Sequence, residues 1–440
     1  MKHNESAKTA WLVMLMDFFH YIALMCTKPY IKSLLNTAEA SDAIAGFIIA
    51  SFSLIQVVNA LFLGKWIQKK GQKLPLVLGA AMYAIAGVFM AFASRIGDML
   101  GSHAEIGLIA LSVLLLGTSH GIFLLSGHYI ITGIPREQGR DKYVGYLTFV
   151  SSIGQFIAPV LAAVILSEPF VKWIEKEAFL NGLSTGNEYI YVLLLSVFAS
   201  VVSFALACVI KNVTNATTKK PAKVGAVIKD RPLMKIVFLN AAVYFSVDVI
   251  GSYMQSYGEE TLLLSAAAAT MVLSAMKFSA IFVRAFLGWL TKLLGSSKLL
   301  KISLLVISVT IVGIGLTNEI STALASLGLP LETTKVAVIM TIGLIYGLAN
   351  GLVNPLAIIE LSNASNDTNR GPALALRNMC NSGGQTLGDI AFGYILGLTS
   401  TYAPVFLISG GMLFGCFLIS FDRKKQKPVG KLMNGKDGIH

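Results

Sequence analysis

The chain alternates between long apolar runs and short polar breaks from Trp11 to Phe421, and this pattern sets the elements that we expect. Each run stays apolar for 20 or more residues, whereas the strands of a membrane barrel change character at every second residue. A helix of about 20 apolar residues crosses the hydrocarbon core and satisfies its own backbone groups. We therefore predict twelve membrane-spanning helices, with approximate limits 9–31, 43–63, 74–94, 107–132, 143–166, 189–210, 233–256, 265–290, 299–317, 336–361, 372–397 and 402–421.

Composition agrees with this pattern. Hydrophobic residues make up 55% of the 440 and charged residues 13%, against about 25% charged residues in a soluble domain. The hydrophilic segments between the runs are shorter than the roughly 50 residues that a domain needs, which argues against a soluble enzyme. The fold class that we predict is an all-α polytopic membrane protein.

The basic residues indicate how the chain is oriented. With the N-terminus placed in the cytoplasm, 26 of the 35 Lys and Arg residues fall on the inner side, six on the outer side and three within spans. This asymmetry sets the orientation of a membrane protein. The net charge of +12 therefore reflects topology, and we expect no nucleic-acid partner. We expect a monomer in the cell (inner or plasma) membrane, with both termini cytoplasmic and the lipid bilayer as its surroundings.

The chain contains an internal repeat. A shift of 230 residues places Gly117-Thr118-Ser119-His120-Gly121 on Gly347-Leu348-Ala349-Asn350-Gly351 and Gly154-Gln155 on Gly384-Gln385. A shift of 224 residues places Gly64 and Gly71 on Gly288 and Gly295. Because each half holds six helices, both halves enter the membrane from the same side. The predicted units are a bundle over 1–210, a basic cytoplasmic linker over 211–232, a second bundle over 233–421 and a basic cytoplasmic tail over 422–440.

Two parallel six-helix halves joined by a basic loop resemble the major facilitator superfamily. The superfamily's loop after span two carries two glycines and several basic residues around an acid, and this chain matches it at Gly64, Lys69, Gly71 and Lys73. Gln68 stands where the acid is expected. The resemblance implies that this loop belongs to a cytoplasmic gate, while the missing acid puts a charge-based latch in doubt.

Span five resembles the antiporter motif of drug:proton exchangers, the multidrug efflux branch of the superfamily. The matching positions are Gly145, Gly154, Ala158, Pro159 and Ala162, with alanine at two glycine positions. Small residues permit close packing of membrane helices, and such packing is also the alternative explanation of the pattern.

Ionisable residues at membrane depth are the candidates for chemistry, because they are costly unless they line a pathway or pair with one another. We expect seven: Asp17, Asp248, Lys277, Arg284, Glu360, Arg377 and Asp389. Asp17, Asp248 and His120 are the candidates for proton coupling. The alternatives are permanent pairs of Asp17 with His20 and of Asp248 with Lys277, and a structural role for His120.

Further residues complete the predicted sites. The candidates for the substrate cavity are His20, Tyr244, Lys277, Asn350, Asn354 and Asp389. The residues Arg284, Glu360 and Arg377 approach the cytoplasmic end, where they can form an ion-paired gate.

Motifs for other chemistry are missing from the sequence. We find no GxxxxGK[ST] phosphate loop, no HExxH and no His and Cys cluster with metal spacing. We expect no cofactor, no metal and no enzymatic activity, and an ion gradient as the energy source. The leading hypothesis is proton-coupled export of a small amphiphilic or zwitterionic compound by alternating access. The alternatives are uptake or exchange of an organic anion, a membrane enzyme built on His20, His120 and His128, and a receptor or structural protein.

Overall fold

The computed structural model describes residues 3–132, 140–176, 189–211, 227–365 and 370–420. Within these ranges every regular element is a helix, which confirms the predicted fold class. The N-terminal half contains α1 His3–Met25, η1 Lys28–Tyr30, α2 Ile31–Thr37, α3 Asp42–Lys70, α4 Lys73–Ala91, α5 Ala93–Leu100, α6 Ser102–Thr132, α7 Arg140–Ile165, α8 Glu168–Lys176 and α10 Ile190–Val209. The C-terminal half contains α12 Arg231–Ser256, η3 Tyr257–Thr261, α13 Ala266–Ala285, α14 Leu287–Leu294, α15 Ser296–Gly315, α16 Thr317–Ala325, α17 Leu331–Ala364, α18 Arg370–Thr399 and α19 Ala403–Ser420.

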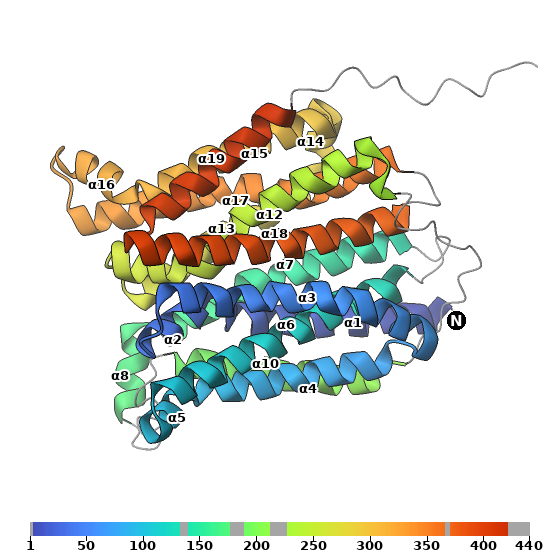
Figure 1. Cartoon of the computed structure of the whole chain (residues 1–440), viewed down its shortest axis with the longest axis horizontal. Helices are drawn as coiled ribbons and strands as arrows, with labels where there is room; N and C mark the ends of the chain where they lie inside the picture. The colour runs from blue at the N-terminus through green and yellow to red at the C-terminus, as the bar shows by residue number, and fades with distance from the viewer. Residues whose placement is uncertain (1–2, 133–139, 177–188, 212–226, 366–369, 421–440) are drawn as a thin grey trace, which may run out of the picture.

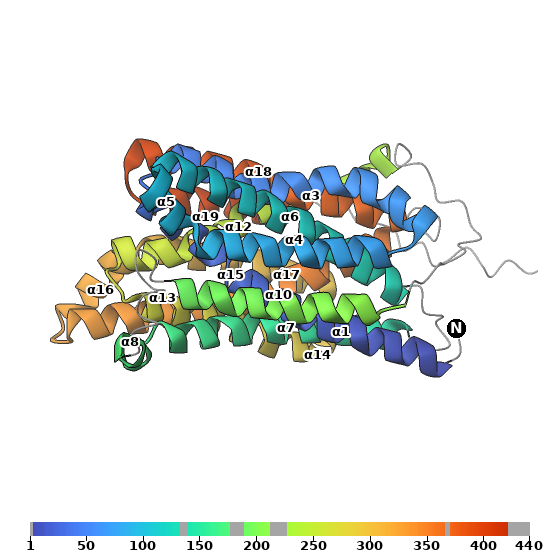
Figure 2. The same cartoon turned by 90° about the horizontal axis from the view of Figure 1, so that it is seen from below.

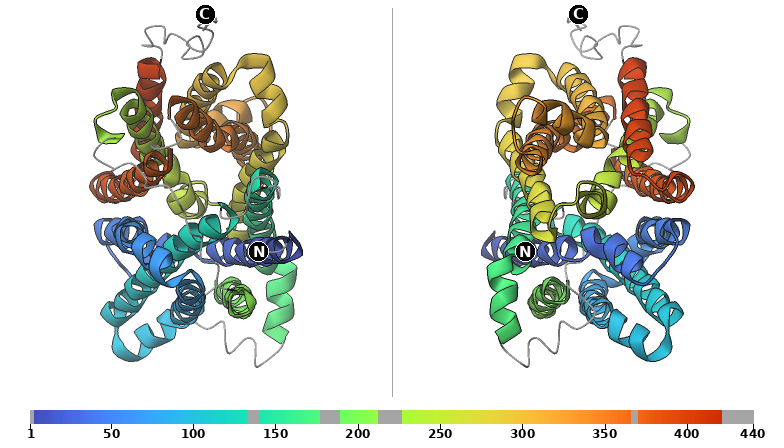
Figure 3. Two further views of the ribbon diagram at one scale, coloured as in Figure 1. Left: turned by 90° about the vertical axis from the view of Figure 1, so that its right-hand side faces the viewer. Right: turned by 90° about the vertical axis from the view of Figure 1, so that its left-hand side faces the viewer.

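The long helices lie side by side along one axis (Figures 1 and 2). We call the end at which α1 begins the terminal end, and the opposite end, where α2, α5, α8 and α16 lie, the distal end (Figure 1). Seen along the helices, the blue-to-green half and the yellow-to-red half form two separate groups (Figure 3). The halves meet mainly where α3 packs against α18 and α7 packs against α13.

Eleven helices in the described part are long and apolar enough to cross a membrane. The remaining predicted span, the eleventh along the chain, is α18, which is more polar because it carries Arg377, Asn381, Gln385 and Asp389. It packs against both α3 and α12, so its polar side chains can face protein instead of lipid.

The two halves repeat the same internal packing, as the sequence repeat predicts. A Cβ atom added at Gly154 of α7 would come within 2.7 Å of the Phe18 carbonyl oxygen of α1. Its repeat partner Gly384 of α18 meets the backbone of Ala241 on α12 in the same way. Close packing at glycine therefore holds α7 on α1 and α18 on α12, and Gly154 of the antiporter-like pattern makes this contact. The side chain of Gly145 lies outside the described residues.

The second alignment of the repeat is borne out by the backbone. Gly71 has a φ of 82° and Gly295 a φ of 78°, although they lie 224 residues apart in the chain. Only glycine adopts this left-handed conformation without strain. Gly71 begins the turn after α3 and Gly295 the turn after α14, so both glycines reverse the chain at the terminal end. The side chains of Gly64 and Lys69, and the segments 212–226 and 421–440, lie outside the described residues.

The first span differs from the expected single helix. It ends as an α-helix at Met25, turns through η1 at Lys28–Tyr30 and continues as α2. Pro29 cannot donate a backbone hydrogen bond, and the Thr27 hydroxyl donates to the Ala23 and Leu24 carbonyl oxygens at 3.0 and 3.1 Å. This break turns Lys28 into the interior, where only 8% of the residue is exposed.

Candidate functional site

A cavity of about 270 Å³ lies between the halves. Helices α1 and α7 line it from the N-terminal half and α12, α13 and α17 from the C-terminal half. Its polar lining consists of Tyr21, Ser152, Gln155, Tyr244, Asp248, Lys277, Arg284, Tyr346, Asn350 and Asn354, set among apolar side chains such as Val243, Val247, Leu273 and Met276. The predicted spans three, six, nine and twelve contribute none of its lining residues.

Four of the six predicted cavity residues line it: Tyr244, Lys277, Asn350 and Asn354. The other two are corrections to the prediction. His20 is buried in the N-terminal half, and Asp389 is buried where α18 faces α3 and α12. Sequence position gave their depth in the membrane, but the direction of each side chain depends on how the helices rotate against one another.

Asp248 is held by an ion pair that joins the two halves. The Lys28 ammonium lies 2.7 Å from Oδ2 and 2.9 Å from Oδ1 of Asp248, and the two side chains are 9% and 14% exposed. The Lys28 ammonium also lies 5.2 Å from the centre of the Phe52 ring. The suggested permanent pair of Asp248 with Lys277 is therefore wrong in this conformation. Sequence reasoning gave Lys28 no role, because the break that turns it inward was not foreseen.

Lys277 and Arg284 project into the cavity from one face of α13. The Lys277 ammonium donates to Gln155 Oε1 at 3.4 Å. Arg284 donates to the Gly351 carbonyl oxygen at 3.0 Å and to Ser152. Both cations thus donate hydrogen bonds from α13 to neutral oxygens, and neither is paired with the cavity carboxylate of Asp248.

The residues assigned to an ion-paired gate have other partners here. Arg377 donates to Asn354, and to Asn378 at 3.2 Å. Glu360 accepts a hydrogen bond from Ser296 at 2.6 Å. The ion-paired gate stays a prediction for a conformation in which the terminal end is closed.

The proton-coupling candidates Asp17 and His120 and the cavity candidate His20 lie inside the N-terminal half. Asp17 accepts a hydrogen bond from Ser151 of α7, and His20 Nε2 lies 2.9 Å from His120 Nδ1. The two imidazole rings stack with centroids 5.2 Å apart, and His20 also stacks on Phe123 at 4.0 Å. The suggested pair of Asp17 with His20 is therefore wrong, since each side chain is directed to a different helix.

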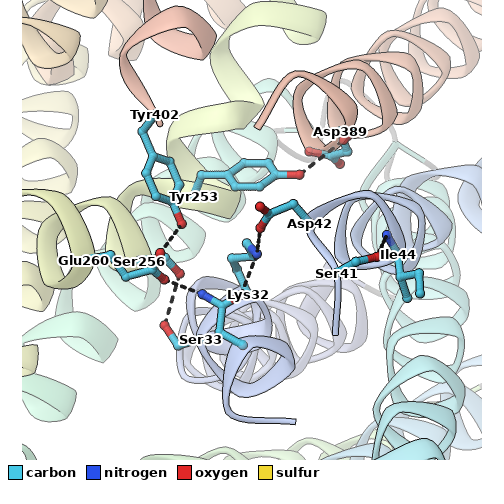
Figure 4. A network of polar contacts seen from close by, with 11 residues as sticks. Lys32, Ser33, Ser41, Asp42, Ile44, Tyr253, Ser256, Glu260, Asp389 and Tyr402 are labelled. Atoms are coloured by element: carbon cyan, nitrogen blue, oxygen red, sulfur yellow. Dashed lines mark hydrogen bonds and ion pairs between the residues drawn. The ribbon is translucent and has the colours of Figure 1, made fainter. Parts of the chain in front are cut away.

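The distal end is closed by a polar network that sequence reasoning did not find (Figure 4). In it, Lys32 pairs with Asp42, and Glu260 of η3 accepts from Asn36 and, at 3.1 Å, from Tyr402. Its other bonds are Ser33 to Glu259 at 3.1 Å, Tyr189 to Glu259 at 2.8 Å and Ser33 to Ser256 at 3.2 Å. The adjacent acids Glu259 and Glu260 at the end of span seven were the available signal.

Backbone contact seals the same end beside the network. Gly46 of α3 and Gly393 of α18 lie against each other, so that a Cβ atom on Gly393 would be 2.5 Å from the Gly46 Cα. The hydrogen bonds described above between the halves lie at mid-depth or at the distal end. This conformation is therefore closed at its distal end, with the cavity beneath the closure.

Known structures share this fold. A D-xylose-proton symporter has a TM-score of 0.72 at 15% identity, with 94% of this chain and 96% of the symporter covered. A bacterial homologue of the iron transporter ferroportin, in its inward-facing state, has a TM-score of 0.70 at 13% identity, with 94% and 98% covered. A nucleoside transporter, NupG, has a TM-score of 0.68 at 13% identity, with 94% and 99% covered. At these identities the likeness shows the fold.

Two relatives by sequence are multidrug resistance proteins of Bacillus subtilis (strain 168). Multidrug resistance protein 2 is 23% identical over 159 residues, which cover 36% of this chain and 37% of the relative. Multidrug resistance protein 1 is 20% identical over 142 residues, with 32% and 34% covered. The chain thus matches about a third of the length of each relative, in agreement with the predicted resemblance to the multidrug efflux branch. The sequence pattern of the Major Facilitator Superfamily matches residues 11–357, and the chain belongs to this superfamily of membrane transporters.

Proposed function

We propose that this transporter exports a small amphiphilic compound bearing an anionic group, either a zwitterion or an anion, in exchange for protons. The observation that carries the proposal is the ion pair between Lys28 and Asp248, which bridges the two halves beside the cavity. In alternating access the halves rock apart at the distal end. The ammonium and the carboxylate sit on opposite halves, so this motion must separate them.

Separation of this pair provides a mechanism for proton coupling. With the distal end closed, the Lys28 ammonium stabilises the ionised Asp248 carboxylate. When the halves part, the carboxylate loses its cation at membrane depth, and binding a proton removes the uncompensated charge. Asp248 would then take up a proton from the distal side and release it when Lys28 returns.

Asp17 and His120 are weaker candidates for coupling because their partners move with them. Ser151 and His20 belong to the same half as Asp17 and His120, so rocking of the halves leaves these hydrogen bonds in place. A coupling group needs surroundings that change between the two states. Among the three candidates, Asp248 has a described partner on the opposite half.

The cavity charges support an anionic group on the substrate. Asp248 is compensated by Lys28, while Lys277 and Arg284 face neutral oxygens. A carboxylate or phosphate placed between these two cations would form charge-assisted hydrogen bonds, which are among the strongest that proteins make. Tyr21, Tyr244 and Tyr346 with the apolar lining suit the remainder of an amphiphilic molecule.

The direction of transport rests on the named relatives. Both are multidrug resistance proteins, which favours export. The second candidate, uptake or exchange of an organic anion, is favoured by the same two cations. The proposal also includes the predicted topology: a cytoplasmic terminal end, bundles over 1–210 and 233–421 joined by a cytoplasmic linker, and a monomer in the cell membrane.

Transport by the purified protein in proteoliposomes tests the proposal. A pH gradient with the distal side acidic should drive accumulation of labelled zwitterionic or anionic amphiphiles toward that side. Asp248→Asn should retain exchange of substrate for substrate but lose the response to the gradient. Substrate flux that ignores an imposed pH gradient in the unmodified protein would contradict proton coupling. A panel of toxic compounds, applied to expressing cells with and without an uncoupler, supplies the substrates.

A further inference from the structure

Asp389 is a buried carboxyl group that the transport cycle described above does not use. It lies on α18 and is 1% exposed. Neither of its carboxyl oxygens accepts a hydrogen bond, although Ser252 lies beside it. The Tyr253 hydroxyl donates instead to the Asp389 backbone carbonyl oxygen at 3.2 Å, as Figure 4 shows.

The charged groups around Asp389 are already paired with one another. Asp248 of α12 is paired with Lys28 of η1, and Asp42 of α3 is paired with Lys32 of α2. The other titratable groups on this side are Tyr253 of α12, Tyr402 of α19 and Glu260 of η3, which accepts from Tyr402 and Asn36. Lys28 and Lys32 thus form ion pairs with Asp248 and Asp42, whereas Asp389, the third aspartate of the group, is not in an ion pair with either lysine.

Closure of the distal end removes water from Asp389. Gly393 follows Asp389 by one helical turn and touches Gly46 of α3 backbone to backbone. A Cβ atom on Gly46 would lie 2.9 Å from the Asp389 carbonyl oxygen, so α3 passes directly over this turn of α18. When α3 and α18 separate, this turn is exposed to water.

From this geometry we propose that Asp389 is a proton-binding site that must be occupied before the distal end closes. An ionised carboxylate buried without a cation of its own is strongly disfavoured, whereas the neutral acid is tolerated. In the closed conformation Asp389 therefore carries its proton. Opening hydrates the group and permits the proton to leave to the distal side.

The sign of the pH effect follows from linkage. At Asp389 the closed state binds one more proton than the open state, so this group makes acid on the distal side stabilise closure and alkali stabilise opening. Asp248, which is proposed to gain a proton on opening, acts with the opposite sign, so the effect of Asp389 is measured in the double variant Lys28→Met with Asp248→Asn, which removes that exchange. Where the open state is ionised, the ratio of open to closed molecules rises up to tenfold for each pH unit. This inference rests on alternating access but not on any substrate, so it can be tested separately from export.

Distance measurements between two labels at the distal end provide the test. Met99 of α5 and Leu327 after α16 are 82% and 78% exposed and lie on opposite halves. Each is replaced by cysteine in a chain that carries Lys28→Met and Asp248→Asn and whose four native cysteines are alanine, and spin-label distances are recorded in nanodiscs from acid to alkaline pH. The population with separated labels should grow with pH, by up to tenfold for each unit.

Variants at position 389 decide between a proton site and a structural role. Asp389→Asn imitates the neutral acid and should stay closed at every pH, and Asp389→Ala gives the same prediction should Asn disturb assembly. Asp389→Glu should restore the pH dependence. The matched control is Asp42→Asn, which loses the pair with Lys32 and shifts the equilibrium but keeps the slope. A Lys28→Met, Asp248→Asn chain without pH dependence, or the same chain with Asp389→Asn and an unchanged slope, overturns the proposal. Absence of transport by the unmodified protein, with this slope intact in the double variant, counts against export alone.

Discussion

Breaking the ion pair between Lys28 and Asp248 should open the distal end. Lys28→Met keeps a long apolar stem but leaves Asp248 uncompensated, with its side chain 14% exposed. Removing one partner of a buried pair costs about 3–5 kcal/mol. Because Asp248 borders the cavity we take the lower value, and at about 1.4 kcal/mol for each factor of ten the ratio of open to closed molecules rises roughly 100-fold.

The distal labels at positions 99 and 327 report this change at neutral pH. Acid should reverse the opening in Lys28→Met, because protonation of Asp248 removes the lone charge. The double variant Lys28→Met with Asp248→Asn has no charge to leave unpaired, so it should close like the unmodified protein while losing its response to a pH gradient in the transport assay.

A surface ion pair supplies the control for this experiment. Lys172 and Glu168 on α8 are 65% and 76% exposed, and such pairs contribute about 0–1 kcal/mol. Lys172→Met should therefore leave the distance distribution unchanged. The reasoning is refuted if Lys28→Met behaves like Lys172→Met, or if the double variant is as open as the single one.

Three further results are expected. Gly393→Leu should prevent closure and abolish transport without preventing membrane insertion, since its Cβ alone would be 2.5 Å from the Gly46 backbone. The control is Gly411→Leu on α19, which should transport normally because position 411 faces open space. Lys277→Gln should weaken the binding of anionic substrates roughly tenfold or more, because a hydrogen bond to a charged group contributes about 1.5–3 kcal/mol. In the same binding titrations neutral substrates should keep their affinity for this variant, and anionic substrates should keep theirs for the control Lys298→Gln, whose side chain is exposed. His120→Gln should lower the free energy of unfolding by about 1–3 kcal/mol through the loss of the hydrogen bond to His20. It should leave the ratio of transported protons to substrate unchanged, and a changed ratio would make His120 a proton-coupling residue again.

The spans and their repeat were predictable because local physics decides them. A chain in lipid must satisfy its backbone within each helix, so continuous apolar runs reveal the spans. The repeat was visible because close helix packing tolerates only small residues, and Gly154 and Gly384 occupy matching contacts in the two halves. Gly71 and Gly295 mark matching turns for a different reason, since both have a positive φ that only glycine adopts without strain.

The helix ends and the direction of each polar side chain were less predictable. The break at Thr27 and Pro29 was read as continuous helix, which hid Lys28. The predicted neighbours of Asp17 and Asp248 were chosen by sequence distance or by depth, and both pairs were wrong. Depth follows from counting residues along a helix, whereas partners depend on rotation and packing.

The sequence by itself determined that this chain is a twelve-helix membrane transporter in two related halves, because burial in lipid constrains every residue of a span. Only the tertiary structure decided that Lys28 meets Asp248 across 220 positions and that Asp389 is enclosed beneath the contact of Gly46 with Gly393. These partners come from different helices, and no local rule of helix formation relates them.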